Sequence, residues 1–173
     1  MKQLHTTEKQ IGNNKFYIRP FKAFVAANIS AELISILSPV LGMLVPLMED
    51  GVTDEDGKID ISNVDAEQFV GAATPALTQI SGDKLEKAMK SLLIVNNNIS
   101  VEGPDTDGSI TVLNEDLANE IFCGELQDML ILCFEVIRIN FKGFFKKLGS
   151  RFGVQLDSLQ LPGTTTKNTE SST

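Results

Sequence analysis

The sequence from Leu126 to Leu148 repeats apolar residues at helical spacing around most of the helix circumference. On a helical wheel the polar residues of this region, together with Glu120 just before it, form one stripe. The stripe consists of Glu120, Gln127, Asp128, Glu135, Arg138, Lys142 and Lys146. The wide remaining face consists of Leu126, Met129, Leu130, Cys133, Val136, Ile137, Phe141, Phe144 and Leu148. This pattern is typical of a helix packed on most sides, so the fold must be built around it.

Asn114 is predicted to cap this helical region, with Glu115 and Asp116 in its first turn. We interpret the whole region as one helix, which would contain both Cys123 and Cys133. Residues 115–135 carry six acids and no base, whereas residues 138–151 carry five bases and no acid. Anions near the N-terminus and cations near the C-terminus complement a helix dipole, so this charge division needs no functional explanation.

A sharper hypothesis concerns the basic, phenylalanine-rich end of the same helix. Phe141, Phe144, Phe145 and Phe152, with Leu148 and interleaved lysines, could form an aromatic docking patch for a partner. Composition favours core packing for most of these phenylalanines, and membrane-surface binding ranks third. The acidic chain weakens the membrane interpretation.

The rest of the chain predicts a mainly helical α+β fold. Hairpins are expected at 5–20, turning at Gly12, and near 99–113. Between the hairpins we expect helices over 21–37, from Pro39 to about Met48, from about 64 to 80 with a kink or break at Pro75, and over 84–95. The first of these has an apolar repeat formed by Phe21, Phe24, Val25, Ile29, Leu33, Ile36 and Leu37.

Composition supports one soluble domain over residues 1–155, followed by a largely disordered tail over 156–173. The chain has 173 residues, of which 42% are hydrophobic. Its formal charge of −8 opposes broad nucleic-acid binding. No secretory signal is expected at the start, and Cys123 and Cys133 are expected to be buried, reduced thiols of a cytoplasmic protein.

The segment from Leu33 to Met48 is uncharged but has only 16 residues and contains two prolines. A membrane-spanning helix needs about 20 apolar residues, so we predict a core helix pair divided at Pro39.

Residues 49–67 hold eight acids and one base, and we interpret them as a solvated loop. An EF-hand alignment on Gly57 fails, because Val52 and Asn63 occupy positions that need carboxylates. His5 is the only histidine, and no nucleotide-binding glycine motif occurs. We therefore predict no enzyme activity, no metal and no cofactor.

The hairpin sequence "IGNNKFYIRPF", the segment "ISVEG" and above all "EVIRINFKGFF" (135–145) resemble the tail assembly chaperones of long-tailed bacteriophages and prophages. The resemblance covers most of residues 3–150. It implies a non-enzymatic protein of the host cytoplasm that binds the tape-measure protein and is not expected in the mature virion. The tail tube protein and self-association are secondary partner hypotheses.

We expect two contact surfaces for such a partner. One is the Phe141–Phe152 segment, and the other is the Leu33–Met48 segment, with Leu41, Leu44 and Leu47 as its contact residues. The alternative function is a structural or tail-completion component of the phage tail.

Overall fold

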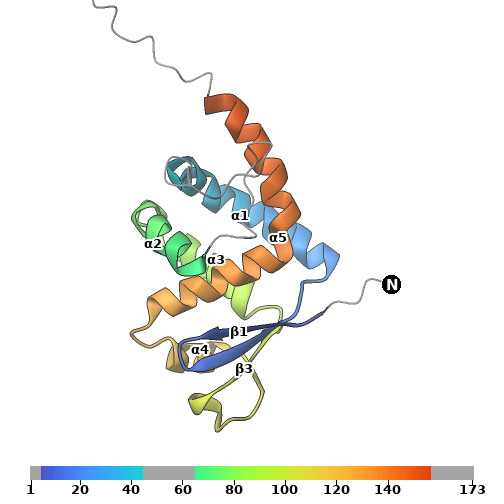
Figure 1. Cartoon of the computed structure of the whole chain (residues 1–173), viewed down its shortest axis with the longest axis vertical. Helices are drawn as coiled ribbons and strands as arrows, with labels where there is room; N and C mark the ends of the chain where they lie inside the picture. The colour runs from blue at the N-terminus through green and yellow to red at the C-terminus, as the bar shows by residue number, and fades with distance from the viewer. Residues whose placement is uncertain (1–4, 45–64, 157–173) are drawn as a thin grey trace, which may run out of the picture.

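A computed structural model describes residues 5–44 and 65–156 of the chain. Its elements are β1 (Thr7–Ile11), β2 (Asn14–Ile18), α1 (Ala23–Leu44), α2 (Ala66–Leu77), α3 (Gly82–Leu93), β3 (Ile99–Glu102), the 3-10 turn η3 (Pro104–Thr106), β4 (Thr111–Val112), α4 (Glu115–Ile121) and α5 (Leu126–Leu156). Helices α1, α2, α3 and α5 gather at one end of the molecule, and the strands lie at the other end with α4 beside them (Figure 1). The predicted mainly helical α+β class is confirmed.

Both predicted hairpins form, and they join into one antiparallel sheet in the order β1-β2-β3-β4. Gly12 makes the first turn with a φ of +54°, a conformation that glycine adopts without steric cost. The two hairpins meet through β2 and β3, where Phe16 lies opposite Val101 and Ile18 opposite Ile99. These four side chains have no exposed surface, because alternate residues of both strands face the helices.

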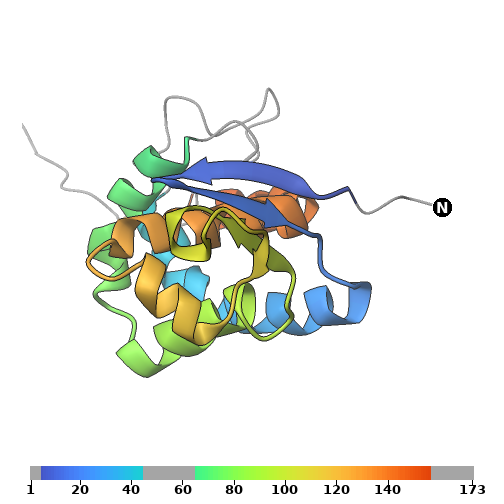
Figure 2. The same cartoon turned by 90° about the horizontal axis from the view of Figure 1, so that it is seen from below.

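The helices cover the buried face of the sheet and share one core with it (Figures 1 and 2). The ring of Phe16 stacks on Phe122 at 5.9 Å between centroids, which fixes the end of α4 against β2. The ring of Phe69 in α2 stacks on Phe134 in α5 at 4.3 Å. The first half of α5 is therefore sandwiched between sheet and helices, as its wide apolar face requires.

The expected single helix after Asn114 is wrong, because the chain breaks between α4 and α5. Asn114 caps α4 as predicted, and its side chain accepts a hydrogen bond from the Leu117 amide at 2.9 Å. After Phe122 the chain leaves the helix, and Gly124 adopts a φ of +82°. A left-handed glycine just beyond a helix end is a common stop signal, and it outweighs the apolar repeat here. Cys123 lies in this break and is exposed, contrary to expectation, whereas Cys133 is buried.

The predicted division at Pro39 is also wrong, since α1 continues from Ala23 to Leu44. A proline within a helix costs about 3 kcal/mol. Burial of Ile29, Leu33 and Ile36 stabilises α1 before the proline, and a local sequence rule does not weigh such packing. Pro75 likewise lies inside a continuous α2, which ends two residues later instead of at Ile80.

Three expectations fall outside the described residues. The first is the solvated loop with its failed calcium motif, of which residues 49–64 are not described. The others are the contact residue Leu47 and the tail beyond residue 156.

Candidate partner-binding site

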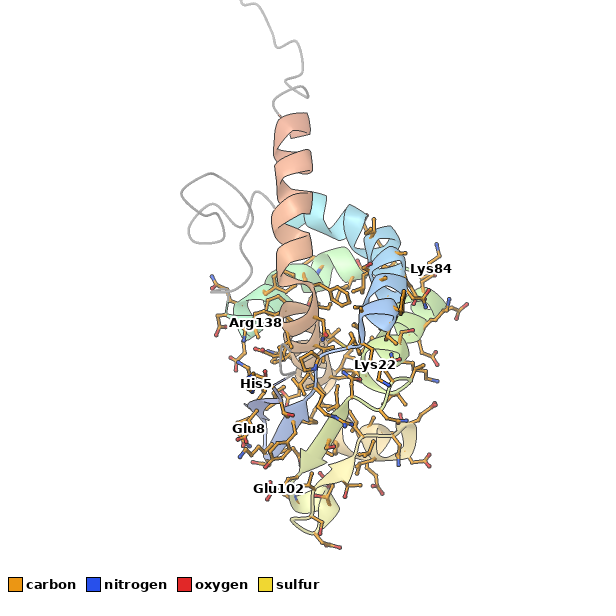
Figure 3. The ribbon with its side chains drawn as sticks, turned by 90° about the vertical axis from the view of Figure 1, so that its right-hand side faces the viewer. His5, Glu8, Lys22, Lys84, Glu102 and Arg138 are labelled. Carbon is orange, nitrogen blue, oxygen red and sulfur yellow. The ribbon has the colours of Figure 1, made fainter. Side chains whose placement is uncertain are left out.

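The described parts of the two expected contact segments lie in the C-terminal parts of α1 and α5. Leu41 and Leu44 belong to the end of α1, and Phe144, Phe145, Leu148 and Phe152 belong to the second half of α5. Helix α5 first runs alongside the other helices and then bends, so that its second half extends away from the sheet (Figure 1). Seen from the side, its end reaches farther from the sheet than α1 does (Figure 3).

Phe141 marks the boundary between the packed and the extending parts of α5. Its side chain is 4% exposed, and its ring packs against Phe21 at 6.2 Å. Phe141 is thus part of the core of this chain. The positions of Phe144, Phe145, Leu148 and Phe152 lie within an arc of about 100° on the helix, and Phe141 falls inside the same arc. The apolar stripe of the core therefore continues along the backbone of the extending half.

Asn140 holds α5 to the start of α1 at this boundary. Its Oδ1 accepts a hydrogen bond from the backbone N–H of Phe21 at 2.6 Å, and its Nδ2 donates to the Val136 carbonyl at 2.8 Å. A side chain that bonds the carbonyl one turn earlier competes with the helix backbone and favours bending. Asn140 and Phe141 together fix where the second half of α5 departs.

A buried ion cluster fixes the first half of α5. Glu135 belongs to the polar stripe of the helix, yet it is only 5% exposed. Both carboxylate oxygens accept bonds from Arg138 at 2.6 Å, and Lys9 of β1 lies 3.4 Å from Oε2. The guanidinium of Arg138 also lies over the Phe134 ring at 5.8 Å. A buried carboxylate needs such partners, and one of them, Lys9, comes from a strand that a wheel of α5 cannot include.

Between α1, α2, α3 and α5 lies a small apolar cavity of about 80 Å³. Its walls include Leu33, Val70, Leu92, Cys133 and Phe134. Burial raises the pKa of the Cys133 thiol to about 12, so this cysteine stays protonated at neutral pH.

Two features that would indicate other kinds of protein, a metal cluster and a membrane-spanning helix, are absent from the described residues. Over residues 5–44 and 65–156, no three His, Cys, Asp or Glu side chains come together as a metal site would require. His5 is exposed at the start of the described chain. None of the helices in these ranges is long and apolar enough to cross a bilayer.

Sequence reasoning missed one feature of α1. Phe24 was assigned to the packed repeat but is 93% exposed. Its neighbour Val25 is partly buried against the core, and consecutive helical residues point about 100° apart. On the helix Phe24 lies at least about 120° from the buried Ile29, Leu33 and Ile36, and this spacing is the signal that could have identified it.

One comparison with known proteins gives a match. A family model described as "Phage tail assembly chaperone protein, TAC" matches residues 12–153, more than four-fifths of the chain. No curated protein and no solved structure matches the chain. The matched range begins in the first hairpin and ends in the second half of α5, so it includes almost every described element.

Proposed function

The chain belongs to the phage tail assembly chaperone family, and we propose that it acts by binding the tape-measure protein during tail assembly. In this role it keeps a long, helical, aggregation-prone partner from associating with itself until tail tube subunits replace the chaperone. The action is non-covalent, takes place in the host cytoplasm and leaves the chaperone out of the mature virion. The tail tube protein is a second candidate partner.

The second half of α5 is the observation that carries this proposal. Its backbone is helical to Leu156 and extends beyond the neighbouring helices (Figures 1 and 3). The sequence places Phe144, Phe145, Leu148 and Phe152 within one arc of that helix. An apolar stripe on a helix is the surface that another amphipathic helix recognises. The end of α1, with Leu41 and Leu44, would supply the adjoining contact.

Phe141 plays a different part in this proposal from the one expected for it as a contact residue. Because its ring packs on Phe21, substitution there would disturb the fold as well as any contact. Phe144 and Phe145 are therefore the positions to substitute.

Co-expression with the tape-measure protein tests the proposal. The tagged chain should retain the tape-measure protein on an affinity column, and Phe144→Asp or Phe145→Asp should abolish retention. The matched control is Leu126→Asp, because Leu126 lies at the other end of the same helix and is 57% exposed. Retention that is equal in all variants would place the contact elsewhere, and no retention by the unsubstituted chain would refute the proposal.

A further inference from the structure

Helix α1 is apolar on two opposite sides. Its inner side packs into the core through Ile29, Leu33 and Ile36, which are 3% to 6% exposed. Its outer side carries Phe24 at 93% exposure and Ile34 at 37%. Ala27 and Ala31 lie between them on the outer side and are exposed as well. Figures 1 and 2 show that α1 begins at the edge of the molecule. An amphipathic surface helix has one apolar face, so the second one needs an explanation.

The outer stripe has a symmetric order of sizes. Along the helix it reads large, small, small, large at Phe24, Ala27, Ala31 and Ile34. The large pair, Phe24 and Ile34, is centred on position 29 of the sequence. The small pair, Ala27 and Ala31, has the same centre. The four positions also lie within an arc of about 80°. A stripe that is the same from either end is complementary to an antiparallel copy of itself, as a two-fold symmetric interface requires.

We propose that a second copy of this chain docks on the outer face of α1. In the antiparallel pair, Phe24 of each copy packs beside Ile34 of the other. Ala27 of each copy meets Ala31 of the other, and these short side chains let the two helices approach closely.

Charge does not oppose this contact locally. From Ala23 to Ile34 the only charged residue is Glu32. Its carboxylate lies 3.0 Å from Nζ of Lys87 on α3 and accepts a bond from Ser91, so it is directed toward α3. Pairing two α1 helices would therefore desolvate no ion on the outer stripe. Uncharged, apolar surface is what the centre of a protein interface contains.

The size of the stripe sets the strength of the dimer. Burying two phenylalanine side chains removes about 300–500 Å² from water. With the neighbouring residues the interface stays at or below about 1,200 Å², the range of weak and transient complexes. We therefore expect a monomer–dimer equilibrium that depends on protein concentration. Two chains of formal charge −8 repel each other, so added salt should strengthen the dimer.

Sedimentation equilibrium of the full chain over a wide concentration range tests the proposal. The unsubstituted chain should dimerise, more strongly at high salt, and Phe24→Asp should raise the dissociation constant at least about tenfold. Ile110→Asp is the control, because Ile110 is 62% exposed in the connection between η3 and β4. Circular dichroism should show that both variants fold, as expected for substitutions at exposed positions.

Cysteine cross-linking tests the register. In a Cys123→Ser background, which removes the exposed thiol, a mixture of Ala27→Cys and Ala31→Cys chains should cross-link more than either chain alone. Preferential cross-linking within either single variant would contradict the antiparallel arrangement.

The dimer is independent of tape-measure binding, so the two proposals can fail separately. A chain that is monomeric at every concentration would overturn self-association. If Phe24→Asp instead abolished tape-measure retention in a monomeric chain, the outer face of α1 would be a partner site and the dimer proposal would be wrong.

Discussion

The two halves of α5 carry the same apolar repeat, but the helix bends between them (Figure 1). In the first half, Leu132 and Val136 have no exposed surface, and Glu135 is neutralised by Arg138 and by Lys9 of the sheet. The second half continues the repeat along a backbone that leaves the other elements behind (Figure 3). Periodicity thus identifies which side of a helix is apolar, whereas the fold and the partners decide what covers that side.

The sharpest test of this difference compares two leucine truncations. Leu132→Ala removes a fully buried side chain and should lower the free energy of unfolding by about 2–5 kcal/mol. Leu148→Ala should change it by less than about 0.5 kcal/mol, the range of surface substitutions, while weakening retention of the tape-measure protein. Urea denaturation followed by circular dichroism measures both. A similar loss in the two variants would mean that the second half of α5 is core in this chain.

A smaller effect is expected when the ion cluster of the first half is broken. Glu135→Gln keeps the size of the side chain but removes the charge that holds Arg138 and Lys9. Loss of hydrogen bonds to charged groups should lower the free energy of unfolding by about 1–3 kcal/mol. The loss should be smaller in high salt, because Lys9 is partly exposed.

The exposed pair of Glu86 and Lys90 on α3 provides the control for Glu135. Lys90 lowers the pKa of the Glu86 carboxyl, yet both groups are solvated, and Glu86→Gln should leave stability unchanged. Equal stability of the Glu135→Gln variant and the unsubstituted chain would show that the cluster does not hold α5 to the sheet.

The elements could largely be predicted from local patterns. The hairpin at Gly12, the cap at Asn114 and the apolar positions Cys133 and Val136 were all correct. The errors occurred where local signals compete: Pro39 was given too much weight as a helix break and Gly124 too little. The outcome at Pro39 depends on packing energies that a window of neighbouring residues does not contain, whereas Gly124 is a local stop signal that competes with the apolar repeat.

The contacts between distant segments could not be predicted. Nothing near Glu135 indicates that Lys9 will neutralise it, and nothing near Phe16 indicates that it will pair with Val101. The same holds for the contact surfaces. Phe141 was expected at a contact surface, yet it has Phe21 as a neighbour, because the segment between β2 and α1 places Phe21 there. Fold class follows from local periodicity. Which apolar side chains become core depends on contacts between distant segments, and local periodicity does not specify those contacts.

The smallest effect is expected at Asn140, where the two halves of α5 meet. Asn140→Ala removes the acceptor for the Phe21 N–H and the bond to the Val136 carbonyl. The loss of a partly buried hydrogen bond should lower the free energy of unfolding by about 1–2 kcal/mol. The more specific result is faster hydrogen exchange at the Phe21 amide, measured by NMR, because that amide would lose its acceptor.

Asn140→Asp separates the two hydrogen bonds of this side chain. Aspartate keeps an oxygen for the Phe21 amide but cannot donate to the Val136 carbonyl. Protection of the Phe21 amide should therefore persist in Asn140→Asp and disappear in Asn140→Ala. If both variants protected the amide as well as asparagine does, then Asn140 would not connect α5 to α1. The packing of Phe141 on Phe21 would then be the main contact that holds the extending half of α5 in place.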